Sequence, residues 1–300
     1  MSKMRKKLDS KYTPLNLVAT FVMILFSIVI LFPLFWALIN SFKHQMDWTW
    51  NKIGFPSNEY SFQPRAWQWE NYSIAFTRMF VKTANGKVFM WQQAINSVLY
   101  AGAFTFAGVF MHSLIAYIVA KYRFKFGKVL YTIVLVTMML PIVGSMSSGL
   151  QVREMLHINE TFIGEFLITL GGFGGMHFLI FYACFKAIPW SYAEAAQMDG
   201  AGHFMIFLRI MMPLAWSTVS AVAILQFIGY WNNYQHVLVY IPNMPTLAVG
   251  LFQFKERPDE TSTEPRRLAA TMMVALPTLA LFVAFRNKIM GNIAVGGLKG

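Results

Sequence analysis

The feature that most constrains this chain is a stretch of 25 residues, from Asn16 to Asn40, that contains no charged side chain. A helix of about 20 apolar residues crosses the hydrocarbon layer of a membrane. The stretch follows a short basic segment, but it is too long for the core of a secretory signal peptide, and no small-residue cleavage site follows it. We therefore predict a membrane-spanning helix that is retained in the protein.

Five further apolar runs follow, and their lengths also suit membrane-spanning helices. They cover about residues 92–120, 128–150, 162–185, 210–241 and 268–285. Because no Gly/Ser linker, low-complexity tract or repeat divides them, residues 16–286 are predicted to form one domain. The predicted fold is an all-α integral membrane protein with six transmembrane helices, the third of which Pro141 kinks or interrupts. The alternative is that the third or fourth run is a buried core helix.

Composition excludes several other classes of protein. Charged residues make up 13% of the chain, against about 25% in a typical soluble domain. The 28 Phe, 12 Tyr and 9 Trp residues argue against disorder. The single cysteine, Cys184, excludes a disulfide scaffold and a cysteine-based zinc site. We expect no metal and no cofactor in this chain.

Positive charge is distributed unevenly between the two sides of the predicted membrane. With six spans both termini lie on one side, which holds 14 Lys and Arg residues and three acidic residues, whereas the other side holds 11 and 10. The positive-inside rule assigns the first side to the cytoplasm. We therefore place the basic segment 1–15 and the tail 287–300 in the cytoplasm. The net charge of +12 indicates attraction to anionic lipid rather than to nucleic acid.

The predicted spans contain few groups that could carry chemistry. Ion-coupled carriers usually place carboxylates inside the bilayer, but among these runs only the fourth holds one, Glu165, near its outer end. His112 and His177 lie deep in their spans, so an ion-coupled secondary carrier using them is an alternative, beside a hydrogen-bonding or pore-lining role. No Gly-Lys-Ser/Thr triplet is present to cradle a phosphate, and no catalytic set of residues is recognised. The chain is therefore predicted not to be an enzyme.

The segment 189–202, between the fourth and fifth runs, predicts a short helix at the cytoplasmic surface. Ser191 and Glu194 have the spacing of a capping box. Alanines at positions 193, 195 and 196 favour a helix and let a partner's backbone approach closely, and Gly200 is placed to end it. The alternative is an ordinary interfacial connector.

A longer pattern begins inside this helix. Glu194-Ala195-Ala196 is followed after three residues by Gly200, and later by Ile210 and Met212-Pro213. The pattern resembles the EAA motif of ABC importer permeases, which usually ends in Leu-Pro, so Met212 is a volume-conserving departure. Further agreement lies in Trp69–Tyr72, Asn96-Ser97, residues 116–124 and the tail Gly296-Gly297-Leu298-Lys299-Gly300, which resembles that of the maltose-type second permease subunit.

This resemblance implies a permease subunit of the carbohydrate-uptake branch, in the cytoplasmic membrane of a bacterium, that imports an oligosaccharide or related sugar. The implied partners are a second, distinct but homologous permease, two ATPase subunits that bind ATP and Mg²⁺, and an extracytoplasmic solute-binding protein. In that family the short helix is a coupling helix, which seats in a cleft of the ATPase and passes on its movement as the importer alternates between inward- and outward-open states. The residues carried over for this contact are Glu194, Ala195, Ala196 and Gly200, and Asp199 and Gly202 are carried over for the turn after it. The tail 287–300 is expected either along the ATPase interface or as a frayed terminus.

Two clusters are candidates for the path of the sugar. Gly174 lies in the run Gly171-Gly172-Phe173-Gly174-Gly175, which either lets helices pack closely or breaks the backbone beside the path. The second cluster combines aromatic and amide side chains, which suit the C–H face and the hydroxyls of a sugar. It consists of Tyr230, Trp231, Asn232, Asn233 and Tyr234. An aromatic belt at the membrane interface is the alternative for this cluster.

The outer segment, about residues 41–91, is long and rich in tryptophan. We expect it to form a small cap that docks the solute-binding protein, or to lie at the headgroups as an interfacial loop. A third hypothesis for the whole chain, beside the importer subunit and the ion-coupled carrier, is a membrane scaffold that transports nothing.

Overall fold

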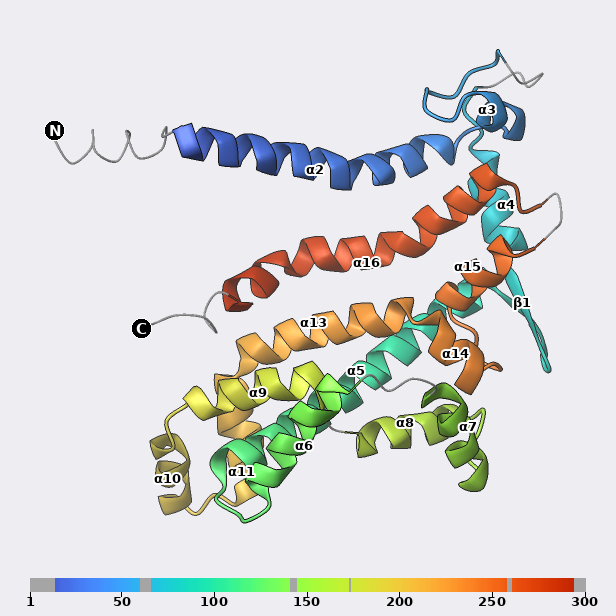
Figure 1. Ribbon diagram of the computed structural model, residues 1–300. Coiled ribbons are helices and arrows are strands. Elements are labelled where there is room, and N and C mark those ends of the chain that lie inside the picture. The colour runs from blue at the N-terminus through green and yellow to red at the C-terminus, as the bar shows by residue number, and fades with distance from the viewer. Residues whose placement is uncertain (1–13, 60–65, 141–144, 173, 258–260, 294–300) are drawn as a thin grey trace. The chain divides into compact units, whose positions relative to one another are not determined.

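The computed structural model describes residues 14–59, 66–140, 145–172, 174–257 and 261–293 (Figure 1). Pro141, Phe173 and most of the two predicted cytoplasmic ends therefore lie outside the described residues. The chain divides into two compact units. The first consists of residues 1–78 and 257–273, and the second of residues 79–256 and 274–300.

The first unit begins with the predicted first span. Helix α2 (Pro14–Asn40) exposes apolar side chains around its whole circumference, as a helix that faces lipid does. Pro33 lies inside α2 without ending it. Two short helices follow, α3 (Gln45–Trp50) and α4 (Glu70–Arg78), and the start of α16 (Glu264–Ile293) completes the unit.

The chain between α2 and α4 folds into a small cap held by buried polar groups. The side-chain amide of Asn71 donates to the backbone carbonyls of Ser41 and Lys43, each at 2.9 Å. The carboxylate of Asp47 accepts from the backbone N–H of Ser57 at 3.0 Å and from its hydroxyl at 3.1 Å. These bonds give a loop-rich segment the internal partners that buried polar groups require.

Aromatic packing closes the same cap. The ring of Phe42 lies 4.6–5.4 Å, between centroids, from the rings of Trp67, Trp69 and Tyr72. Burial lowers the pKa of Lys43, whose ammonium group donates to the backbone carbonyl of Asn51. Because their rings contact Phe42, Trp67 and Trp69 pack against the cap, although both side chains also remain exposed.

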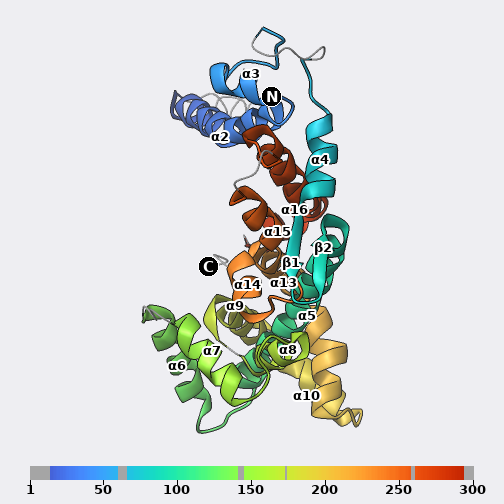
Figure 2. The same cartoon turned by 90° about the vertical axis from the view of Figure 1, so that its right-hand side faces the viewer.

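The second unit begins with an antiparallel hairpin that leads into the longest helix. Strands β1 (Phe80–Thr83) and β2 (Gly86–Phe89) pair Phe80 with Phe89 and Thr83 with Gly86. Helix α5 (Met90–Lys121) follows directly, and Figure 2 shows the hairpin beside its first turns. The motif residues Asn96 and Ser97 lie here. Asn96 donates to the carbonyl of Pro245, and Ser97 accepts from the N–H of Leu247, the first residue of α15 (Leu247–Lys255).

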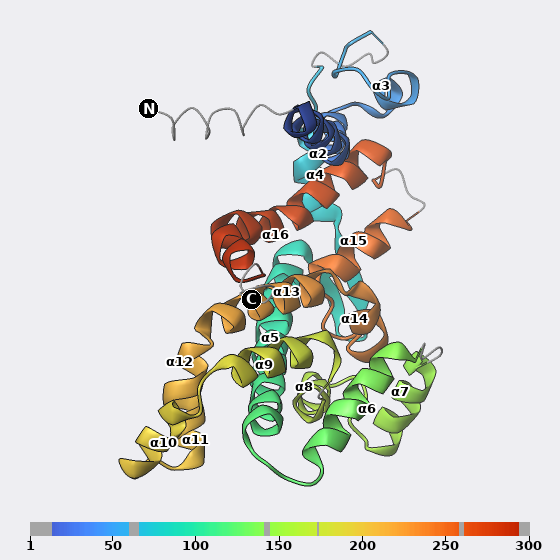
Figure 3. The ribbon, with the colours of Figure 1, turned by 60° about the vertical axis from the view of Figure 1, so that its left-hand side comes forward.

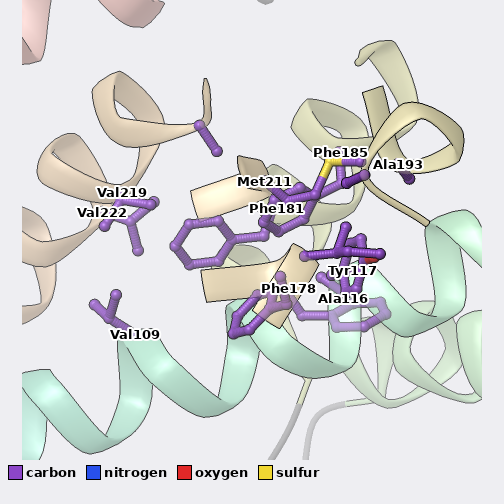
Figure 4. Packing of buried hydrophobic residues seen from close by; sticks show 14 of the residues in the cluster. Val109, Ala116, Tyr117, Phe178, Phe181, Phe185, Ala193, Met211, Val219 and Val222 are labelled. Carbon is purple, nitrogen blue, oxygen red and sulfur yellow. The ribbon is translucent and has the colours of Figure 1, made fainter. Parts of the chain in front are cut away.

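Helix α5 forms the centre of the second unit, with α9 (Gly175–Ala187) and α13 (Trp216–Asn232) packed against it. Gly108 faces α13, and a Cβ atom there would lie 2.5 Å from Oε1 of Gln226, so a larger residue would have to displace the end of that side chain. A cluster of large apolar side chains fills the space between the three helices (Figure 4). It includes Tyr117, Phe178, Phe181, Phe185 and Met211, each at most 2% exposed.

Three of the six predicted spans form single long helices, and the other three are bent or divided. Residues 16–40, 90–121 and 264–285 form helices that are long and apolar enough to cross a membrane. The fourth run divides into α8 (Phe162–Gly171) and α9, which are bent by 46°. Before α13, residues 203–214 are helical but bent from it by 83°, and α14 (Tyr234–Tyr240) follows it after Asn233.

The third predicted span, 128–150, is divided between two helices. Helix α6 (Gly127–Met139) has 13 residues, and α7 (Ser145–Met155) is a separate helix. Leu140 is extended, with ψ of 123°, because the proline that follows it in the sequence disfavours the helical conformation. The remaining short elements, α10 (Ser191–Met198), α11 (His203–Ile206), the π-helix η1 (Phe207–Met211) and α12 (Met212–Leu214), lead into α13 (Figure 3).

Candidate functional site

Helix α10 begins one residue earlier than the sequence predicts. Its N-cap is Trp190, whose carbonyl accepts from the backbone N–H groups of Ala193 and Glu194 at 2.8 and 3.2 Å. Ser191 is thus already the first helical residue, and no side chain caps the helix. The capping box predicted for Ser191 and Glu194 is therefore wrong. Trp190, at the position before the helix, itself has helical dihedral angles (φ −70°, ψ −22°), and its indole cannot accept a hydrogen bond, so no side chain caps the first turn.

The end of α10 agrees with the prediction for Gly200. This glycine has φ of +80°, and its N–H donates to the carbonyl of Gln197 at 3.0 Å. The N–H of Ala201 donates to the carbonyl of Ala196 at 2.9 Å. The two bonds form a Schellman motif, in which a left-handed residue closes the helix and satisfies its last carbonyls.

The two faces of α10 differ in what they contact. Ala193 and Ala196 are 0% and 7% exposed, and both pack into the apolar cluster of the second unit. The other predicted coupling residues are exposed; they are Glu194, Ala195, Asp199, Gly200 and Gly202. Ala196 therefore packs α10 onto its own chain, and the other five are exposed.

Two side chains tie this region to the end of α5. The Lys121 ammonium group donates to the carbonyl of Ile188, just before α10. The hydroxyl of Tyr122 lies 2.9 Å from Nδ1 of His203, the first residue of α11, and 3.3 Å from the hydroxyl of Tyr117. The ring of Tyr122 also meets that of Trp190 edge to face. Helix α10 is thus held at both ends by α5 and the residue after it.

From His203 the chain reaches α13 through closely packed turns. Phe207 and Met211, in the π-helix, are fully buried in the apolar cluster. The chain then turns by 83° after α12, which contains Pro213. The stretch that carries the EAA pattern, Glu194 to Pro213, is therefore packed into the apolar cluster at its two parts, through Ala196 in α10 and through Ile206, Phe207 and Met211 after it, with an exposed turn between them.

The candidate substrate-path residues are not gathered around one point. Gly174, with φ of +122°, precedes α9 at the break after α8. Trp231 is buried, and its indole N–H donates to the carbonyl of Val274 at 3.3 Å. Tyr230 faces the rings of Tyr100 and Phe104, at 5.8 and 5.7 Å between centroids.

The two amides of that cluster serve the local backbone. Asn232 donates to the carbonyl of Ile228 within α13, and Asn233 caps α14 by accepting from His236. Both residues are exposed, so their remaining hydrogen-bonding capacity is open.

The histidines of the proposed ion-coupled carrier lie near each other. The rings of His112 and His177 are 6.0 Å apart between centroids, and Nδ1 of His112 contacts the carbonyl of Gly108 in its own helix. Within the described residues no group of three His, Cys, Asp or Glu side chains is arranged to hold a metal ion.

A buried charged cluster, missed at the level of sequence, joins α7, α8 and α14. Glu165 is 3% exposed and accepts from both Nε and Nη2 of Arg153, at 2.6 and 2.7 Å. Nε2 of His236 lies 3.0 Å from the same carboxylate. The hydrogen bonds with Glu165 raise the pKa of Arg153, whose guanidinium also lies 3.8 Å from the centre of the Tyr240 ring. A carboxylate in an apolar run was the available signal, because such a group needs a partner.

Comparison with known proteins decides the family. The family model described as "Binding-protein-dependent transport system inner membrane component" matches residues 112–287, which include α10 and the turns after it. The chain belongs to this family. Nothing in the comparisons favours an ion-coupled carrier.

Individual relatives extend the likeness beyond the matched region. This permease is 26% identical over 292 residues to the arabinooligosaccharides transport system permease protein AraQ of Bacillus subtilis (strain 168), covering 97% of this chain and 98% of that protein. It is 25% identical over 280 residues to the diacetylchitobiose uptake system permease protein NgcG of Streptomyces coelicolor, covering 92% and 86%.

A solved structure has the same fold. It is the crystal structure of a bacterial ABC transporter involved in the import of the acidic polysaccharide alginate. One of its chains superposes with a TM-score of 0.72, at 18% identity, over 92% of this chain and 98% of that one. At this identity the likeness concerns the fold alone.

Proposed function

We propose that this permease is the transmembrane subunit of an ATP-driven ABC importer that moves a carbohydrate, in particular an oligosaccharide delivered by a solute-binding protein. The observation that carries the proposal is the match of residues 112–287 to a family of binding-protein-dependent transport components. The names of the relatives, which transport arabinooligosaccharides and diacetylchitobiose, support the class of substrate. The chain itself is a transport subunit and not an enzyme.

The assembly around it would contain a second, homologous permease and two ATPase subunits, which bind ATP and Mg²⁺. Six spans would cross a bacterial cytoplasmic membrane: α2, α5, α6 with the residues after it, the bent pair α8 and α9, α13, and α16. The excess of basic residues on the side of both termini favours the cytoplasm for that side. The tail 287–300 would lie along the ATPase interface.

Helix α10 would be the coupling helix. Its exposed residues Glu194, Ala195, Asp199 and Gly200, with Gly202 in the turn after it, would contact the cleft of an ATPase subunit. Ala196 would support the helix from behind, because it packs into the permease's own core. Movement of α10 would reach α13 through α11, η1 and α12, which are packed rather than loose.

The break at Gly174 would line the substrate path, and the exposed amides of Asn232 and Asn233, beside Tyr230 and Trp231, would bond sugar hydroxyls or support the residues that do. The cap around Asn71 would meet the solute-binding protein.

The test is uptake of a labelled arabino-oligosaccharide by proteoliposomes that contain the purified complex. We expect Glu194→Gln to reduce ATP-dependent uptake at least tenfold while the solute-binding protein still binds its sugar. Glu154→Gln, the same change at an exposed position of α7, is the matched control and should keep uptake unchanged. Equal uptake by the two variants would contradict the role of α10. Uptake that needs a proton gradient but no ATP would favour the carrier that uses His112 and His177.

A further inference from the structure

The turn between α5 and α6 borders a cavity of about 1290 Å³. Its walls come from the end of α5, the first turns of α6, Tyr182 of α9 and Trp190 before α10. All of these elements belong to the second unit. The cavity therefore lies at the ends of three helices that the proposed topology places in the membrane, beside the start of the coupling helix.

Four basic residues and no acidic residue line this cavity. The basic residues are Lys121, Arg123, Lys125 and Lys128. Lys121 donates to the carbonyl of Ile188. Among the described residues no carboxylate lies within ion-pair distance of the other three, and all three are exposed. The cavity thus concentrates positive charge that no carboxylate of the described residues pairs with, and it is suited to an anion.

Aromatic rings form the other part of the wall. Tyr131 and Tyr182 face each other with 4.6 Å between ring centroids, and the ammonium group of Lys186 lies 5.5 Å from the centre of the Tyr182 ring. Aromatic side chains with a polar tip are typical of the headgroup level of a membrane, where one end is apolar and the other is hydrated. This combination favours a ligand that is itself both charged and apolar.

An apolar stripe on α6 continues from the cavity. Lys128 and Thr132 line the cavity, and Leu135 and Met139, seven and eleven residues after Lys128, extend the same face of the helix. Both are exposed, Met139 at 83%. From Lys128 to Met139 the helix rises about 16 Å, which is close to half of the roughly 30 Å hydrocarbon layer. The face of α6 from Lys128 to Met139, taken with the cavity end, therefore spans about one leaflet.

We propose that this cavity and stripe bind an anionic phospholipid of the cytoplasmic leaflet. The phosphate of the headgroup lies among Arg123, Lys125 and Lys128, and an acyl chain lies along Leu135 and Met139 of α6. A free phosphate would use the cations but not the stripe. The inference rests on the orientation given under the proposed function, which turns the cavity toward the cytoplasm. The bound lipid would brace the ends of α5, α6 and α9 next to Trp190, where α10 begins.

The test measures lipid binding directly and needs no transport. The purified complex is delipidated in detergent and titrated with phosphatidylglycerol or phosphatidylcholine, and bound lipid is counted by native mass spectrometry. We expect phosphatidylglycerol to bind at least tenfold more tightly than phosphatidylcholine. The triple variant Arg123→Gln, Lys125→Gln, Lys128→Gln should lose at least tenfold in affinity for phosphatidylglycerol, since each cation near an anionic headgroup adds to binding.

A matched variant, Lys52→Gln, Lys82→Gln, Lys87→Gln, removes the same charge from exposed positions on the predicted outer side and should bind phosphatidylglycerol like the parent. Equal affinity of both triple variants would overturn the proposal. Displacement of the lipid by millimolar inorganic phosphate would overturn it in favour of a free-anion site. Binding to the permease pair that disappears when the ATPase subunits are added would overturn it in favour of a protein partner. Thermal unfolding of each variant is measured in parallel, so that misfolding is distinguished from lost binding. Because lipid binding is measured without transport, a failure of sugar uptake would contradict the proposed function and not this inference.

Discussion

The hydroxyl of Tyr122 lies 2.9 Å from Nδ1 of His203, although 81 residues separate them in the chain. Tyr122 follows the last residue of α5, and His203 begins α11, directly after the turn that ends α10. The contact holds the far end of the proposed coupling helix against the longest span of the second unit. Force applied to α10 therefore acts on α5 as well as on the route through η1 to α13.

Loss of this hydrogen bond should weaken coupling more than it weakens folding. A net contribution of about 1 kcal/mol corresponds to about a fivefold change between the seated and displaced positions of α11. We expect Tyr122→Phe to lower the sugar transported per ATP hydrolysed by about twofold to fivefold, measured in proteoliposomes. Ser220→Ala removes a hydroxyl that bonds the carbonyls of Trp216 and Ser217 within α13, and it serves as the control. An unchanged transport ratio in Tyr122→Phe would show that the contact carries no force.

Gly200 and Gly202 differ only in what their backbone requires, so they form a matched pair. Gly200 has φ of +80°, while Gly202 has φ of −70°, and a Cβ atom at either would meet nothing within 4 Å. Gly200→Ala should cost about 1–2 kcal/mol, because a left-handed backbone is unfavourable for alanine. We expect a lower unfolding temperature for Gly200→Ala and an unchanged one for Gly202→Ala, by thermal denaturation of the purified complex. Equal effects of the two would mean that the Schellman turn adds nothing to stability.

The ion pair of Glu165 with Arg153 should matter most when only one partner is removed. Their side chains are 4% and 10% exposed, so Glu165→Ala leaves a buried, unpaired guanidinium, at a cost of about 3–5 kcal/mol. The double variant Glu165→Leu, Arg153→Met removes both charges and should recover a large part of that loss. Thermal unfolding of the three proteins tests this, and a double variant that is less stable than Glu165→Ala would contradict it.

The sequence predicted well what depends on local composition. Hydropathy alone predicts both ends of the helix over residues 16–40, because a helix that faces lipid must be apolar on all sides. The turn at Gly200 followed from the freedom of glycine at positive φ. The buried cluster could not be found this way, since Arg153, Glu165 and His236 are brought together only by the packing of α7, α8 and α14. Tyr230 and Trp231 illustrate the same limit: as neighbours on a helix they face different surroundings, so a sequence cluster does not make a site.

Asn71 should be the residue on which the outer cap depends. Its side-chain amide donates to the carbonyls of Ser41 and Lys43, at 2.9 Å each, from a position that is 6% exposed. Asn71→Ala would leave both carbonyls without this donor, at a cost of about 2–3 kcal/mol. We expect faster hydrogen exchange in residues 41–51, and at least threefold weaker stimulation of transport by the solute-binding protein. Ser73→Ala, on the exposed side of the same helix, is the control. If exchange accelerates while stimulation is unchanged, the cap is a folded element without a role in docking.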